Sequence, residues 1–146
     1  MSRTDSWTVT LWVLAAINLA NGIWMLLGPE GWYYGLPAAV PDTGPLNLHF
    51  VRDIGATYVT MAAALFWAGA RPADRVPLVA MVLLFHVLHG AEHVLDTLAG
   101  RLPASHWLID FPGVYLPMLV LAAVLWLLAA RSPRSPGSAR SKTIST

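Results

Sequence analysis

The stretch FHVLHGAEHVLD, residues 85–96, decides how this sequence is interpreted. It lies within an otherwise apolar run, 76–99, that is long enough to cross a membrane as a helix. A helix turns by about 100° per residue, so side chains three or four positions apart lie on one face. Because ionisable groups in a membrane helix normally face a partner or a cavity, the stretch predicts a polar stripe inside a helical bundle. The stripe consists of His86, His89, His93 and Asp96.

The composition indicates a membrane protein. Of the 146 residues, 56% are hydrophobic and 12% are charged, whereas a soluble globular domain is about one quarter charged. The lipid bilayer is therefore the expected partner. The net charge of +1 gives no reason to expect nucleic-acid binding. The chain has no cysteine, which excludes disulfides, thiolate metal sites and cysteine nucleophiles.

Four apolar runs predict an all-α, four-span transmembrane helix bundle over residues 1–130. Each run has the roughly 20 residues that an α-helix needs to cross the hydrocarbon core. The expected spans are 7–28, 46–70, 76–99 and 112–130.

The segments between and after these spans are expected to be loops and a tail. Residues 29–45 contain four prolines and three glycines, which exclude a continuous helix. Residues 71–75 and 100–111 form the other two loops. Pro117 is expected to kink the last span, which lipid-embedded helices tolerate. Residues 131–146 are rich in Ser, Arg and Pro and are expected to be disordered.

Basic residues predict which side of the membrane each loop occupies. The N-terminus, the 71–75 loop and the tail hold seven Arg and Lys residues, whereas the other two loops hold only Arg101. Cytoplasmic loops carry the excess of Arg and Lys. The protein is therefore expected in the inner or plasma membrane of the cell, with both termini in the cytoplasm.

This orientation places polar residues of three spans in the outer half of the bilayer, with His106 and Asp110 in the adjoining loop. We therefore expect one polar pocket that opens to the outer side between the second and third spans. The residues assigned to this pocket are Asn18, Asn21, His49, Arg52, Asp53, His86, His89, Glu92, His93 and Asp96.

The first hypothesis is that the pocket binds a metal ion, since imidazole and carboxylate are common ligands of transition metals. A haem held by histidines of two spans, or a quinone-type redox site, is a variant. Histidine titrates near neutrality, so the same groups could act as acid and base on a lipid-soluble substrate. Residues 89–93 match the H-x-x-E-H pattern of inverted zinc peptidases, but the chain is too small to favour proteolysis. The expected metal ligands are His86, His89, His93 and Asp53.

The second hypothesis is a non-enzymatic membrane subunit whose polar cluster clamps its own helices or binds a partner subunit or a second copy. Arg52 would then pair with Asp96 or Glu92, and Asp53 with a protonated histidine of the third span. The sequence leaves open whether the protein is an enzyme.

The layout resembles the DoxX-like group of small bacterial four-helix membrane proteins. Two features carry the resemblance. Four spans are contained in fewer than 150 residues, and the second span opens with Arg52-Asp53-Ile54-Gly55. The resemblance covers the bundle and implies the fold and a bacterial membrane location, but not a mechanism.

Overall fold

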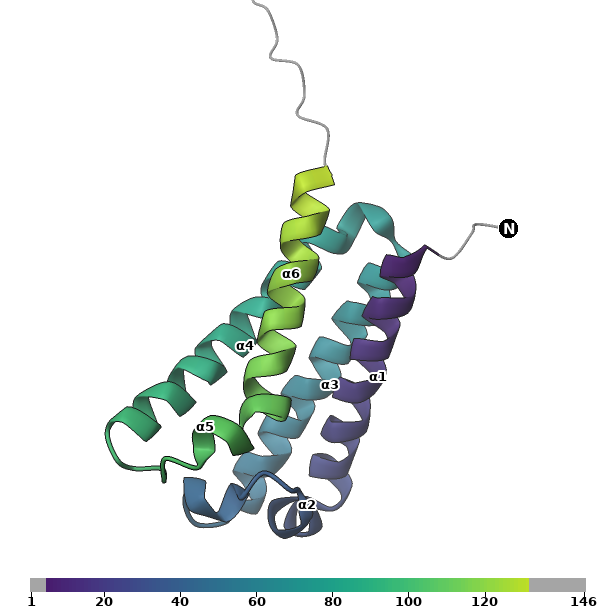
Figure 1. Ribbon diagram of the computed structural model, residues 1–146. Coiled ribbons are helices and arrows are strands. Elements are labelled where there is room, and N and C mark those ends of the chain that lie inside the picture. Colours follow the sequence, from purple (N-terminus) through teal and green to yellow (C-terminus); the bar gives the residue numbers. More distant parts are fainter. Residues whose placement is uncertain (1–4, 132–146) are drawn as a thin grey trace, which may run out of the picture.

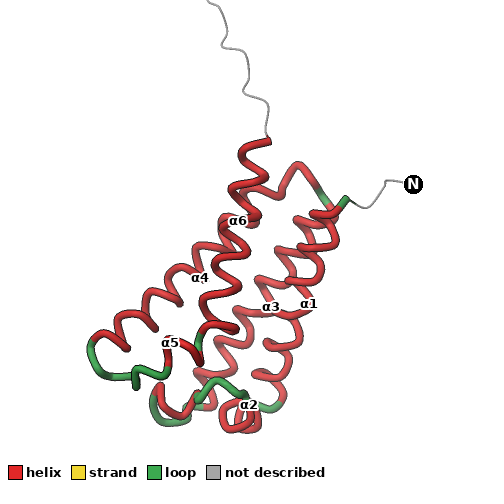
Figure 2. Tube along the Cα trace, viewed as in Figure 1, coloured by secondary structure: helices red, strands yellow, loops and turns green. Residues whose placement is uncertain are grey.

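The structure is a computed structural model that describes residues 5–131. Within this range the chain is helical and contains no strand, and four long helices run up and down side by side (Figure 1, Figure 2). The all-α class is therefore confirmed, whereas the predicted disordered tail lies outside the described residues. The long helices are α1 (Ser6–Leu27), α3 (Leu48–Ala70), α4 (Arg75–Leu98) and α6 (Leu116–Arg131).

Short helical turns occupy the connections between the long helices. The expected loop at 29–45 contains a seven-residue helix, because Pro29 suits a first helical turn and Glu30 favours the positive end of the helix dipole. The short elements are α2 (Pro29–Gly35), η1 (Val40–Thr43), η2 (Pro72–Asp74), α5 (His106–Ile109) and the π-helical turn η3 (Phe111–Tyr115).

Among residues 5–131, three helical segments are long and apolar enough to cross a membrane: Ser6–Leu27, Pro72–Leu98 and Phe111–Ala130. They indicate a membrane protein. Helix α3 has 23 residues but is not among the three. Its first two turns carry His49, Arg52 and Asp53, which lower its mean hydropathy. The fourth span therefore stays a prediction.

Side-chain caps set where two of the long helices begin. Asp5 accepts a hydrogen bond from the backbone N–H of Thr8 at 2.8 Å, and Asn47 accepts one from the N–H of Phe50 at 3.1 Å. Such caps satisfy N–H groups that have no partner within the helix. After α4, Gly100 has a φ of 70°. Glycine adopts this left-handed conformation without a Cβ clash, so it favours the end of the helix there.

Helices α1 and α3 form the tightest pair because two glycines face each other. A Cβ added to Gly22 would lie 2.7 Å from the carbonyl oxygen of Gly55, and one on Gly55 would lie 2.8 Å from the Cβ of Met25. Small residues of this kind let membrane helices approach closely. The buried core lies beside this pair, in the half of the bundle nearer the start of α1. Its members include Leu11, Ala15, Met61, Leu65, Ala68, Val79, Val82, Leu121 and Val124.

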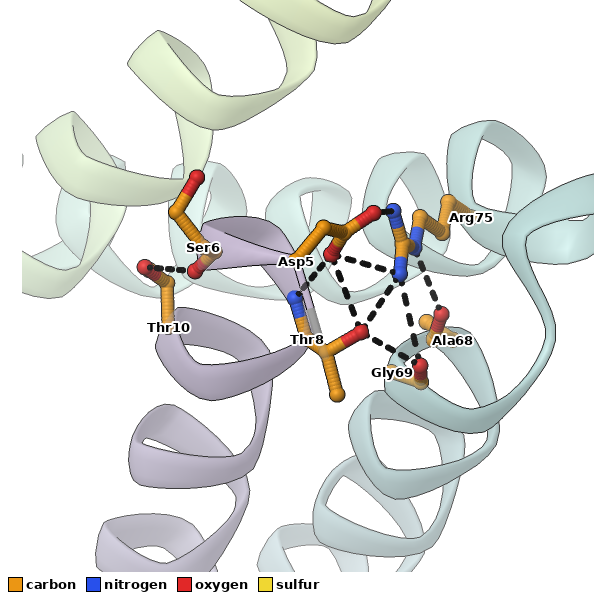
Figure 3. A network of polar contacts seen from close by, with 7 residues as sticks. All are labelled: Asp5, Ser6, Thr8, Thr10, Ala68, Gly69 and Arg75. Atoms are coloured by element: carbon orange, nitrogen blue, oxygen red, sulfur yellow. Dashed lines mark hydrogen bonds and ion pairs between the residues drawn. The ribbon is translucent and has the colours of Figure 1, made fainter. Parts of the chain in front are cut away.

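A buried arginine joins three helices at the end of the bundle where α1 begins (Figure 3). The guanidinium of Arg75 binds both carboxylate oxygens of Asp5, at 2.8 and 3.1 Å, and donates to the hydroxyl of Thr8 at 2.7 Å. It also donates to the carbonyls of Ala68 and Gly69, at 3.1 and 3.4 Å. These five residues are called the Arg75 network below. Its cation lies at the C-terminus of α3, where the helix dipole favours positive charge.

The charge of Asp5 is stabilised within this network. The hydrogen bonds from Arg75, together with the cap to Thr8, hold the pKa of Asp5 well below its usual range. The sequence-based count treated Arg75 only as a basic loop residue, whereas it is the first residue of α4 and 5% exposed.

Just before Pro117 the chain forms the π-helical turn η3, and the predicted kink at Pro117 stays a prediction. Proline has no N–H, and its ring would clash with the carbonyl of Gly113, four residues earlier. The N–H groups of Val114 and Tyr115 both point to the carbonyl of Asp110, at 2.8 and 3.4 Å. A π-helical turn of this kind is often found at functional sites, and here it directly follows Asp110.

Candidate metal centre

A buried cluster of two histidines and one aspartate lies at the end of the bundle opposite the Arg75 network. His93 comes from the last part of α4, His106 begins α5, and Asp110 follows α5 directly. Figure 1 shows α5 beside the far end of α4. The N–H of Asp110 bonds to the carbonyl of His106 at 3.0 Å, and this turn places both side chains on one face. These three residues are called the His–Asp centre.

Asp110 bridges the two histidines. Its Oδ2 lies 2.7 Å from Nδ1 of His93, and its Oδ1 lies 3.0 Å from Nδ1 of His106. The side chains of Asp110 and His106 are 2% and 0% exposed, and that of His93 is 16% exposed. One potential ligand atom from each residue lies within 4.8 Å of the others. The centre therefore presents two nitrogens and a carboxylate oxygen at close range.

A second carboxylate faces the other side of the His106 ring. Oδ2 of Asp42, in η1, lies 3.2 Å from Nε2 of His106. Burial disfavours the charged form of the ring, but the hydrogen bonds to Asp110 and Asp42 outweigh it, so the pKa of His106 is raised above its ordinary value. Each ring nitrogen of His106 thus faces a carboxylate, an arrangement that favours the protonated ring, in which both nitrogens donate.

Of the stripe predicted on α4, only His93 belongs to the His–Asp centre. The rings of His89 and His93 meet edge to face with centroids 4.8 Å apart, and His89 stacks on Phe85 at 5.8 Å. His86 is buried at 2% exposure, two turns further into the bundle. Asp96 pairs with Arg101 at 2.6 Å rather than with Arg52, and Glu92 is exposed.

The residues of α3 that were assigned to the pocket lie on the exposed surface of the bundle. His49 and Asp53 pair with each other at 3.3 Å, with side chains 89% and 61% exposed, and Arg52 is also exposed. Their helical phase explains this. Val51 and Gly55 are buried, and residues two positions away point to the opposite side of a helix. Of the predicted ligands His86, His89, His93 and Asp53, the structure therefore brings only His93 into the described cluster.

The two asparagines of the predicted pocket form hydrogen bonds within α1 and from α1 to its neighbour α2. Asn18 is buried and donates from Nδ2 to the carbonyl of Leu14 at 2.8 Å. Oδ1 of Asn21 accepts a hydrogen bond from the indole of Trp32 at 2.9 Å. Asn21 therefore fixes α2 against the end of α1.

Sequence reasoning placed His106 and Asp110 near the pocket but did not include them in it, and it did not consider Asp42. The available signal was the four-residue spacing of His106 and Asp110, which places two ligand types on one turn of helix. For Asp42 the sequence offers no comparable signal, because the residue lies in a proline-rich connection.

Searches against family models, curated proteins and solved structures find no match to this chain. The DoxX-like resemblance therefore stays a prediction.

Proposed function

We propose that this protein binds one divalent transition-metal ion at the His–Asp centre. The observation that supports this is the convergence of three buried ligand atoms, all within 4.8 Å of one another, from separate elements. Two imidazoles and one carboxylate leave further coordination positions open, as in catalytic zinc sites and in non-haem iron sites. Zinc is the reference ion for testing the proposal.

The spacing suits such an ion after a side-chain adjustment. Metal–ligand bonds of about 2.0–2.1 Å place tetrahedral ligand atoms about 3.3 Å apart. Asp110 meets the two histidines through its two different oxygens, at 2.7 and 3.0 Å, and one ligand atom of each residue lies within 4.8 Å of the others, so the side chains must rotate to bring all three atoms to bonding distance of one ion. A haem is less well supported, because the ligand atoms converge on one point rather than on opposite faces of a flat ring.

Asp42 supplies the support that metal-bound histidines usually have. When Nδ1 of His106 binds the ion, Nε2–H can donate to Asp42 across the observed 3.2 Å. A carboxylate in this place fixes the tautomer and increases the basicity of the ligand. Binding would displace the proton that His106 Nδ1 shares with Asp110, so metal and proton compete.

The alternative is that the centre is an interhelical clamp. The specific observation in its favour is that Asp110 already bonds both histidines without an ion, thereby joining α4 to α5. In that case its loss would affect stability alone, by about 1 kcal/mol for each hydrogen bond.

We also propose that α3 is a fourth span and that both termini are cytoplasmic. Helix α3 packs along α1 and joins it through the Gly22–Gly55 contact, so it shares the depth of a helix that is itself a candidate span. Arg75 is neutralised by Asp5, but six basic residues still remain on the termini side against Arg101. Single cysteines introduced into the 71–75 loop or the 100–105 loop test the orientation when intact spheroplasts are treated with a membrane-impermeant thiol reagent. Only the cysteine in the 100–105 loop should be labelled.

Titration calorimetry with zinc tests the metal proposal on purified protein that has first been treated with a chelator. We expect one ion per chain, and loss of binding in Asp110→Asn and His106→Gln. The matched control is His49→Gln, which removes a histidine from an exposed pair with a similar geometry and should leave binding intact. Full-strength zinc binding by Asp110→Asn would refute the proposal. Absence of zinc binding in the wild type, with reduced stability in both variants, would support the clamp.

A further inference from the structure

An apolar groove lies between α4 and the segment formed by η3 and α6. Its volume is about 370 Å³, within the range of about 300–1,000 Å³ that is usual for small-molecule sites. In Figure 1, α4 and α6 diverge toward the end of the bundle that carries α5, and the groove lies along this part of the seam. A tyrosine carries the single hydroxyl of the lining. The residues that matter below are Val87, Gly90, Ala91, Val94, Tyr115 and Met118.

Both walls of the groove lead to ligand residues of the His–Asp centre. On α4, Gly90 precedes His93 by three residues, and side chains at this spacing are neighbours on a helix. On the opposite wall, the N–H of Tyr115 points to the carbonyl of Asp110 at 3.4 Å, so Asp110 lies one π-helical turn before Tyr115. The walls are close here, since a Cβ added to Gly90 would lie 3.9 Å from Cδ1 of Tyr115. The groove therefore borders the centre.

The hydroxyl of Tyr115 is buried and has no hydrogen-bond partner within residues 5–131. Its ring is held in place on two sides, because it stacks on Trp107 of α5, with centroids 6.4 Å apart, and lies against Gly90 of α4. A buried hydroxyl without a partner costs free energy, and phenylalanine would supply the same ring without that cost. The hydroxyl thus adds no hydrogen bond to the fold and is free to donate to a ligand.

The surroundings of the groove limit what can occupy it. Its two walls belong to the candidate membrane spans Pro72–Leu98 and Phe111–Ala130, so its occupant comes from the bilayer. Lipid tails are as apolar as the lining, so a chain alone gives little selectivity. Selectivity must come from a polar head that uses the open positions of the metal and accepts a hydrogen bond from Tyr115. A carboxylate does both, as a common zinc ligand and a strong acceptor.

We propose that the groove holds the chain of a long-chain carboxylic acid, whose carboxylate binds the metal ion of the His–Asp centre and accepts a hydrogen bond from Tyr115. The assignment rests on the metal proposed for that centre, and it names the class of ligand that fills the open coordination positions. A neutral ester or alcohol with the same chain should bind more weakly, because its oxygen carries no charge.

The direction of the groove agrees with this ligand. The centre lies at one end of the bundle, and from there the groove runs along α4 from Val94 inward to Val87. A lipid acid in a bilayer has the same orientation, with its head at the surface and its chain toward the middle. Residues 87–95 extend over about 12 Å of helix, which accommodates part of one extended chain.

Photolabelling of the full, zinc-loaded chain in phosphatidylcholine nanodiscs tests the proposal. The probe is palmitic acid with a diazirine in its chain, and mass spectrometry of the digested protein locates the label. We expect the label on residues that line the groove, including Met118. Unlabelled palmitate should compete with the probe, whereas methyl palmitate, which has the same chain but no charged head, should not. Removal of zinc with a chelator should also reduce the labelling.

Ala91→Trp is the variant that fills the groove. Ala91 lines the groove but is exposed, so a larger side chain there does not enter the core. We expect labelling to fall by about tenfold or more, with the zinc stoichiometry unchanged. Ala16→Trp is the matched control, because Ala16 is an exposed alanine of α1, outside the groove. It should retain full labelling.

Tyr115→Phe separates a ligand contact from a structural role. Loss of a hydrogen bond to a charged group should weaken palmitate binding by about tenfold. The thermal stability should not fall, because the hydroxyl has no partner among the described residues. Reduced stability with unchanged labelling would show a structural tyrosine and overturn its assignment as a ligand contact.

Zinc calorimetry on the same preparations keeps this proposal apart from the metal site itself. If zinc binds but Ala91→Trp and Ala16→Trp are labelled equally, or methyl palmitate competes as well as palmitate, the groove holds an ordinary annular lipid only. That result would overturn the ligand assignment and leave the metal site in place. Absence of zinc binding in the wild type would refute the metal site, and the carboxylate assignment with it.

Discussion

The two ends of the bundle each bury charge, but they do so in different ways. In the Arg75 network one guanidinium faces one carboxylate, and the donors left over are satisfied by carbonyls of α3. In the His–Asp centre a buried carboxylate is shared by two histidines, and Asp42 adds a second carboxylate. Arginine stays protonated at all relevant pH values, whereas histidine changes charge near neutrality.

The difference separates a structural site from a responsive one. The Arg75 network has a fixed charge, and each guanidinium nitrogen has at least one hydrogen-bond partner, so it holds three helix ends in one arrangement. The His–Asp centre can gain or lose a proton and can exchange that proton for a metal ion. We therefore expect changes at the first end to affect folding and changes at the second to affect binding.

The largest expected effect on stability is that of Arg75→Met. It removes the buried cation and leaves the carbonyl of Ala68 without its side-chain donor, whereas the carbonyl of Gly69 keeps the hydroxyl of Thr8 as a donor. Removing one partner of a buried, hydrogen-bonded charge typically costs about 3–5 kcal/mol, and the partial exposure of Asp5 places this case near the lower value. Thermal unfolding in detergent, followed by circular dichroism, measures it.

Arg101→Met is the matched control for that change. Arg101 also pairs with an aspartate, Asp96, but its side chain is 62% exposed, and exposed pairs contribute about 0–1 kcal/mol. Equal destabilisation by both variants, or loss of zinc binding in Arg75→Met protein that remains folded, would remove the distinction between the two ends.

The sequence predicted the helical class and the polar face of α4 because both follow from local periodicity. It could not predict the partners of that face. Asp110 and His106 meet His93 because the single-turn helix α5 packs against the end of α4, and such a tertiary contact leaves no trace in local periodicity. Arg75 shows the same limit: its burial depends on where α3 ends. His49 and Asp53 carried the right chemistry, but Val51 and Gly55 determine which side of α3 packs, and this directs the pair outward.

The next effect concerns pH. The raised pKa of His106 means that its charged form stabilises the metal-free fold fully below the unfolded value, about 6.5, and that this contribution is lost as the pH rises through the folded pKa. Metal binding has the opposite dependence, since the ion needs the deprotonated nitrogen. If binding displaces one proton, zinc affinity should fall by about tenfold for each unit by which the pH is lowered below the folded pKa of His106.

Calorimetry and thermal unfolding from about pH 5 to about pH 9, on either side of the ordinary histidine value, measure both trends. In His106→Gln the pH dependence of the metal-free stability should be reduced over this range. The Arg75 network should not contribute there, because the pKa of Asp5 is held far below this range by Arg75. A zinc affinity that does not change with pH would contradict the assignment of His106 Nδ1 as a ligand atom.

The smallest expected effect is that of Asp42→Asn, and it tests whether the second carboxylate supports the His–Asp centre. Asparagine keeps an oxygen that can accept from Nε2 of His106 but removes the charge. Changes in groups that orient a metal-bound histidine typically lower metal affinity by about 10–100-fold, and because Asp42 is 45% exposed we expect about tenfold. Asp53→Asn is the control, since it makes the same change in an exposed His–Asp pair of similar length, 3.3 Å. Zinc titration should therefore separate the two variants, and equal affinities would show that Asp42 only borders the centre. The charge of Asp42 would then contribute to the raised pKa of His106 without contributing to the hold on a metal ion.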